Sequence, residues 1–150
     1  MSKISYNSIM KNPSLCDGAG YRTVVFLQGC NLRCNNCQNK DTWDIDKGQC
    51  VDTKELAGLI RKQTRNKKIT LTGGEPLLQI EAVIDLINEL DGYNICLYTG
   101  HDISEVPQEI LSKIHYIKYG PFVESLKTTL TPFVGSSNQV FMEVNNETSK

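Results

Sequence analysis

Short apolar runs alternate with amphipathic segments through the middle of this chain, and the alternation predicts an α/β fold. Four runs rich in β-branched and apolar residues are typical of strands, at residues 23–27, 69–72, 95–98 and 114–119. Between them, apolar residues recur at the three- and four-residue spacing of helices that bury one face. Strands that alternate with helices form mostly parallel sheets, so we expect helical crossovers between neighbouring strands.

Three helices are expected from this spacing. The first begins after Asp52, where Glu55 follows three residues later as in a capping box. The second covers residues 80–90 and ends before Gly92, because glycine adopts the left-handed conformation that terminates many helices. The third is weaker and covers residues 104–113.

Chain length limits the number of domains. With 150 residues the chain can form one domain with a core, which we expect to cover residues 1–150. A complete eight-stranded barrel typically needs about 250 residues. After residue 120 the pattern weakens, and it indicates a turn at 135–138 and a last strand at 139–144.

Charge and hydropathy exclude two classes of partner. The formal net charge is −1, and the charged residues are mixed along the chain, so the basic surface that binds a phosphate backbone is not expected. No apolar run approaches the roughly 20 residues of a membrane span, and the N-terminus lacks the apolar segment of a signal peptide. We therefore expect a cytoplasmic protein that binds neither nucleic acid nor membrane.

The six cysteines fall into two groups. Cys16, Cys50 and Cys96 are scattered singly, and a lone cysteine is usually a small buried hydrophobe. The other three cysteines lie within eight residues, in a loop after the first expected strand. A disulfide framework is not expected, because cytoplasmic thiols stay reduced.

The clustered cysteines are Cys30, Cys34 and Cys37, and three thiolates suit either zinc or an iron–sulfur cluster. A structural zinc site needs a fourth ligand, for which Cys16, Cys50 and His101 are candidates. A four-iron cluster on three thiolates instead leaves one iron open to a substrate.

The loop Cys30-x3-Cys34-x2-Cys37 after a strand resembles the signature of radical S-adenosylmethionine (SAM) enzymes. The resemblance implies that these cysteines hold a [4Fe-4S] cluster and that SAM binds the open iron. It also implies a truncated radical SAM fold, which is a partial, open (β/α) barrel of mostly parallel strands.

A second segment, Gly73-Gly74-Glu75-Pro76, matches the same family because it follows the second expected strand, where these enzymes receive the methionyl ammonium of SAM. Glycines let a ligand approach the backbone, and a carboxylate accepts charge-assisted hydrogen bonds from an ammonium. Alone, the segment is also typical of a turn with proline at a helix start. By position in the family fold, further contacts to the cofactor are expected from Thr99 and from the backbone around Asn36, Cys37 and Gln38.

Other segments narrow the resemblance to the activating proteins of anaerobic ribonucleoside-triphosphate reductase. They are Gln28-Gly29-Cys30, Asn39-Lys40-Asp41-Thr42-Trp43, Gly120-Pro121-Phe122-Val123-Glu124 and Gly135-Ser136-Ser137-Asn138-Gln139. The resemblance extends from Asp17 to about Val140, while Gln38 and Tyr119 depart from the pattern of many relatives.

This resemblance implies a reaction and two protein partners. An electron from a flavodoxin-like donor enters the cluster, SAM is cleaved to methionine and a 5′-deoxyadenosyl radical, and the radical takes hydrogen from a backbone glycine of a large reductase subunit. One alternative is an activase of another glycyl radical enzyme, of the pyruvate formate-lyase type. A different class, a zinc or electron-transfer module without enzymatic activity, leaves residues 73–76 unexplained. Lys118, near a strand end, is read first as a surface lysine and second as a ligand of the SAM carboxylate.

Overall fold

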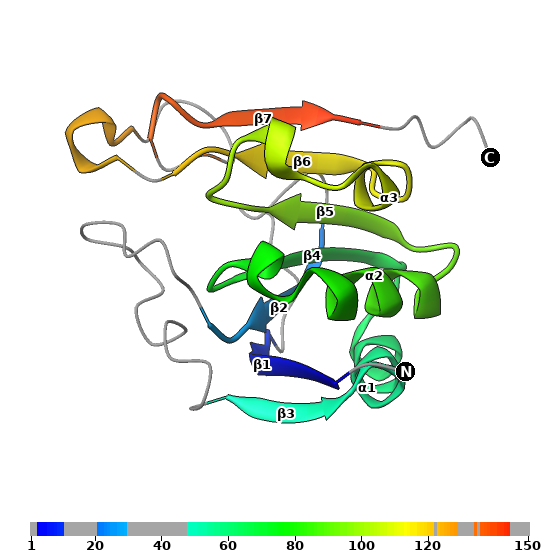
Figure 1. The fold of residues 1–150 in the computed structure, drawn as a ribbon. Helices are drawn as coiled ribbons and strands as arrows, with labels where there is room; N and C mark the ends of the chain where they lie inside the picture. The colour runs from blue at the N-terminus through cyan, green and yellow to red at the C-terminus, as the bar shows by residue number, and fades with distance from the viewer. Residues whose placement is uncertain are drawn as a thin grey trace.

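A mixed sheet of seven strands is the framework of the protein (Figure 1). The computed structural model describes residues 3–10, 21–29, 48–121, 123–128, 134 and 136–144. The strands are β1 (Lys3–Ile9), β2 (Thr23–Leu27), β3 (Gln49–Asp52), β4 (Lys68–Gly73), β5 (Asn94–Tyr98), β6 (Tyr116–Tyr119) and β7 (Val140–Glu143). The α-helices are α1 (Thr53–Gln63), α2 (Ile80–Glu89) and α3 (Gln108–Leu111), and short 3-10 helices occur at η3 (Pro76–Gln79), η4 (Ile103–Glu105) and η5 (Glu124–Leu126).

The strand order is β3-β1-β2-β4-β5-β6-β7. The central strands β2, β4, β5 and β6 are parallel neighbours, whereas β1, β3 and β7 pair antiparallel at the two sides. Because β3 and β7 occupy opposite edges, the described strands form an open sheet. The predicted α/β class, with an open and mostly parallel central sheet, is confirmed.

The central strands lie where the hydrophobic pattern predicts them. Strand β2 has the predicted bounds, and β4 and β5 differ by at most one residue at each end. Strand β6 begins at Tyr116, because the N–H of Ile114 still donates to the carbonyl of Ile110 in the preceding helical turn, at 3.2 Å. Helix α3 is shorter than expected, since Pro107 is its N-cap and a separate turn, η4, precedes it.

Asp52 does not cap its helix as the sequence predicts. It occupies the N-cap position of α1, but its side chain makes no capping hydrogen bond. Its carboxylate instead lies 3.4 Å from the ammonium of Lys3, the residue paired with it between β1 and β3. A capping box does form at η4, between Asp102 and Glu105. Hydrogen bonds from the side chain and then the backbone of Ser104 hold the pKa of Asp102 below its usual range.

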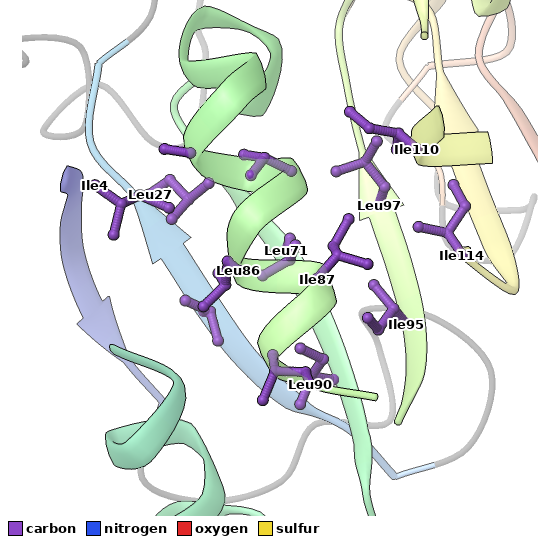
Figure 2. Packing of buried hydrophobic residues seen from close by; sticks show 14 of the residues in the cluster. Ile4, Leu27, Leu71, Leu86, Ile87, Leu90, Ile95, Leu97, Ile110 and Ile114 are labelled. Atoms are coloured by element: carbon purple, nitrogen blue, oxygen red, sulfur yellow. The ribbon is translucent and has the colours of Figure 1, made fainter. Parts of the chain in front are cut away.

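Packing of α2 on the parallel strands forms much of the core (Figure 2). Alternate residues of β4 and β5 point toward this helix, among them Leu71 and Leu97, and meet Leu86 and Ile87 of α2 (Figure 2). Burial of each such side chain contributes about 1.5–3 kcal/mol relative to exposure. Among the helices of the described residues, none is both long and apolar enough to cross a bilayer.

Arg22, just before β2, is fully buried and joins the starts of three strands. Its Nη2 donates to the carbonyls of Ile69 and Asn94, both at 2.8 Å, and its Nε donates to the hydroxyl of Thr70 at 3.1 Å. The guanidinium also lies 5.6 Å from the ring centroid of Tyr116 in β6. Since hydrogen bonds to a charged group are stronger than neutral ones, these contacts hold the amino-terminal ends of the parallel strands together.

Candidate functional site

The predicted cluster ligands Cys30, Cys34 and Cys37 lie outside the described residues, as do Asn36 and Gln38. Their roles stay predictions. The structure does describe the backbone up to Gly29, the residue before the first of these cysteines, and the whole of the glycine-rich segment that follows β4.

The glycine-rich segment lies against the backbone that leads to the cysteine loop. Parallel pairing of β2 with β4 places Gly73 beside Leu27. The pairing continues beyond the strands, because the N–H of Gly74 donates to the carbonyl of Leu27 at 3.0 Å and that of Glu75 donates to the carbonyl of Gly29 at 2.7 Å. The segment that the sequence assigns to SAM therefore lies against the described backbone directly before the cysteine loop.

Gly73 can only be glycine in this arrangement. Its φ is +107°, in the region that disfavours side chains. A Cβ atom built on it would lie 2.4 Å from both the backbone N and O of Leu27. The contact between the ends of β2 and β4 thus requires glycine at this position, whether or not a ligand also approaches it.

The carboxylate of Glu75 is buried and joins β4 to β5. Its Oε2 accepts hydrogen bonds from the backbone N–H of Leu77 at 2.9 Å and from the hydroxyl of Thr99 at 2.7 Å. Its Oε1 accepts from the N–H of Gly100 at 2.7 Å, and the residue is only 1% exposed. A carboxylate has about four acceptor positions, and donors from the described residues occupy three of them.

Thr99 and Pro76 take part in the same arrangement. The hydroxyl of Thr99 donates to Glu75 and accepts from the N–H of His101 at 3.1 Å. Pro76 is the first residue of η3, where its missing N–H costs nothing. Sequence reasoning assigned Glu75 to a ligand and missed its hydrogen bonds to Thr99 and Gly100 after β5, for which the sequence carries no local signal.

The side chains of the remaining candidates have other surroundings. In the described part of the chain, no group of three or more His, Cys, Asp and Glu side chains could hold a metal ion. His101 pairs with Glu105 at 2.7 Å, and Cys50 is exposed on the edge strand β3, whereas Cys96 is buried in β5. Lys118 places its ammonium 4.1 Å from the ring centroid of Tyr98.

Comparison with known proteins identifies the family. A family model described as a 4Fe-4S single cluster domain matches residues 16–142. The anaerobic ribonucleoside-triphosphate reductase-activating protein of Salmonella typhi is 32% identical over 139 residues, which are 84% of this chain and 90% of that protein. The chain belongs to this family of activating proteins. The Escherichia coli (strain K12) member is 29% identical with the same coverage.

Two further likenesses are more limited. The pyruvate formate-lyase-activating enzyme of Clostridium pasteurianum is 42% identical over 86 residues, which are 52% of this chain and 35% of that enzyme. The crystal structure of QueE from Escherichia coli superposes with a TM-score of 0.58 at 19% identity and covers 78% of this chain and 70% of its own. At that identity, the likeness supports the fold alone.

Membership in this family confirms the predicted radical SAM class and its cofactors, a [4Fe-4S] cluster and SAM. The described residues fit these groups. Three thiols follow Gly29 in the sequence, and soft thiolates are the usual ligands of iron–sulfur clusters. The segment that the family uses for SAM is hydrogen bonded directly to Gly29.

Replacement of Glu75 with glutamine is expected to lower the free energy of unfolding of the apoprotein by about 2 kcal/mol. The glutamine amide has one oxygen for three donors. Its NH2 group would face an N–H or O–H group that donates to the carboxylate in the unmodified protein. Urea unfolding monitored by circular dichroism measures the change. Exposed Glu109 is the matched control, and Glu109→Gln should stay within about 0.5 kcal/mol of the unmodified protein. Equal stability of the two variants would contradict the structural role of the carboxylate.

Proposed function

We propose that this protein uses SAM to generate a glycyl radical on an anaerobic ribonucleoside-triphosphate reductase. Its relatives of 29–32% identity, over most of the chain, are named as activating proteins of that reductase. The observation that carries the proposal is the pair of hydrogen bonds that hold Gly74 and Glu75 against Leu27 and Gly29, directly before the cysteine loop.

In this proposal, the thiolates of Cys30, Cys34 and Cys37 hold the cluster, and the Gly73 to Pro76 segment receives the ammonium of SAM. The cluster held by these thiolates would supply the one-electron chemistry toward SAM. The chain supplies orientation. The glycines would let SAM approach the backbone, and the Glu75 carboxylate, which three donors hold in place, would accept from the ammonium.

Thr99 is proposed to border the cofactor at the end of β5, with Asn36 and Gln38 near its adenine. Because Thr99 already donates to Glu75, its contribution includes fixing the carboxylate. A radical that abstracts hydrogen must be shielded from water and aimed at its target, so these residues act chiefly by position.

The proposed partners are the large reductase subunit and a flavodoxin-like electron donor. An open sheet with β3 and β7 at separate edges is compatible with entry of a glycine-bearing loop from the partner. We propose further that the protein acts in the cytoplasm without binding nucleic acid or membrane, as the mixed charge and the lack of long apolar runs in the sequence suggest.

A second partner is a pyruvate formate-lyase-type enzyme. The observation that favours it is the 42% identity to the Clostridium pasteurianum activating enzyme over 86 residues. That match covers about half of this chain, whereas the matches to reductase-activating proteins cover 84%. The reductase is therefore the first choice.

The function is tested by anaerobic reconstitution with iron and sulfide, followed by reduction and addition of SAM and the purified reductase. We expect formation of 5′-deoxyadenosine and methionine, and a glycyl-radical signal in electron paramagnetic resonance (EPR) that depends on SAM. A lack of SAM cleavage would exclude the enzyme and favour a zinc or electron-transfer module. Cleavage with a radical on pyruvate formate-lyase but none on the reductase would transfer the assignment to the second partner.

A further inference from the structure

The amide side chain of Gln79 joins three parts of the fold that meet beside the cysteine loop. Gln79 is the last residue of η3, directly after the glycine-rich segment. Its Oε1 accepts from the N–H of Ser5 at 2.8 Å, and its Nε2 donates to the carbonyl of Ser5 at 3.0 Å. The same Nε2 donates to the carbonyl of Gln28 at 3.1 Å.

Ser5 and Gln28 are also bonded to each other. The N–H of Gln28 donates to the carbonyl of Ser5 at 3.1 Å, so this carbonyl accepts from both glutamines. Gln28 is fully buried and comes two residues before Cys30. The backbone is therefore fixed on both sides of the Cα atom of Gln28, through its N–H by Ser5 of β1 and through its carbonyl by Gln79.

The side chain of Gln28 is held as well. Its Oε1 accepts from the Nδ2 of Asn7 at 3.1 Å. Asn7 lies where the pairing of β1 with β2 changes register between Tyr6 and Ser8, as in a β-bulge. Bulges redirect side chains, and here the redirected amide reaches Gln28.

The chain returns from the cysteine loop to this same point. A Cβ atom built on Gly48 would lie 2.5 Å from Cβ and 2.6 Å from Cγ of Gln28, and 2.9 Å from the carbonyl oxygen of Tyr6. Gly48 therefore packs directly on the side chain of Gln28. Residues 28 and 48, which flank the three cysteines, are in contact at the place where Gln79 binds.

We infer that Gln79 is a positioning residue that fixes the start of the cluster loop relative to the SAM segment. The glycine-rich segment continues directly into the turn that ends at Gln79. The backbone bond between Glu75 and Gly29 joins this segment to the start of the cysteine loop, and the hydrogen bonds of Gln79 with Ser5 and Gln28 join them a second time. Catalytic groups are sensitive to displacements of about 1 Å, which can cost about 100-fold in rate. The inference rests on the proposed function for its catalytic consequence, but the contacts themselves are present without cofactors.

Hydrogen exchange of the full-length apoprotein, followed by mass spectrometry, tests the contacts. In Gln79→Leu, the N–H of Ser5 loses its acceptor and the carbonyl of Gln28 loses a donor, so amides in peptides that contain residue 5 and residues 28–29 are expected to exchange about tenfold faster. Peptides of β5 should keep their protection. Exposed Gln63 at the end of α1 is the control, and Gln63→Leu should change neither set of peptides. Unchanged exchange at residues 28–29, or an equal increase in all peptides, would overturn the inference.

A second variant and a second measurement separate this inference from the function itself. Gln79→Glu keeps the acceptor for the N–H of Ser5 but loses the donor to the carbonyls of Ser5 and Gln28, so it should show the increase at residues 28–29 if Gln79→Leu does not fold. After reconstitution, both variants are expected to bind iron but to give an altered EPR spectrum of the reduced cluster with SAM. If the unmodified protein fails to cleave SAM, the function fails while the exchange result still stands. If it cleaves SAM and both variants match its exchange and its spectrum, only the role of Gln79 fails.

Discussion

Replacing any one of Cys30, Cys34 and Cys37 with alanine is expected to abolish SAM cleavage. Each thiolate is proposed to bind one iron of the cluster, and residues that merely support metal ligands already change metal affinity or activity by about 10–100-fold. Loss of a direct ligand should therefore exceed 100-fold. Cleavage is measured as 5′-deoxyadenosine formed after anaerobic reconstitution, together with the iron bound per chain.

The matched controls for these variants are Cys50→Ala and Cys96→Ala. Cys50 is exposed on an edge strand and Cys96 is buried in β5, so neither belongs to the cysteine loop. Both controls should bind about four iron atoms per chain and cleave SAM. Full activity in a Cys34→Ala variant, or loss of iron in Cys50→Ala, would contradict the assignment of the ligands.

Gly73→Ala is expected to lower the free energy of unfolding by at least about 3 kcal/mol, through backbone strain and steric overlap together. The new Cβ would lie 2.4 Å from two backbone atoms of Leu27. Backbone atoms within a paired strand cannot move aside as a flexible side chain can. Because the overlap pushes apart the strand ends that carry the cluster and SAM segments, SAM cleavage should fall as well. Chemical denaturation of the apoprotein measures the first effect and 5′-deoxyadenosine formation the second.

Gly92→Ala is the control for the backbone conformation. Gly92 also has a positive φ, +85°, but nothing lies within 4 Å of a Cβ built on it. It should lose only about 1–2 kcal/mol through strain and keep its activity. The difference between the two variants therefore measures the contact with Leu27, and equal losses would show that this contact contributes nothing.

The sequence predicted the central strands, of which β2, β4 and β5 are buried at nearly every residue. Strands β4 and β5 are almost continuously buried, and their runs of Ile, Leu and β-branched residues are easily recognised. Strands β1 and β3 were missed because they are short or half-exposed. In β1, Ile4 and Tyr6 are buried while the alternate residues are polar, an alternation that could have indicated the strand.

The candidate site was predictable only as far as local motifs describe it. The cysteine spacing and the residues 73–76 are contiguous patterns, so they could be recognised directly. The contacts of Glu75 with Thr99 and Gly100 join residues 24 and 25 positions apart, and they depend on strand register. Sequence reasoning also missed the burial of Arg22, since an arginine before a strand is ordinarily exposed.

The hydrogen bonds of Glu75 also limit how this enzyme can diverge. The carboxylate of Glu75 accepts from the N–H of Gly100, and its backbone N–H donates to the carbonyl of Gly29. The carboxyl ends of β2, β4 and β5 are therefore joined by hydrogen bonds through this one residue. We expect substitutions in these three loops to be non-additive, because their residues share one hydrogen-bond network. Adaptation to a new protein partner should therefore accumulate around β6 and β7, leaving the chemistry of the first three parallel strands intact.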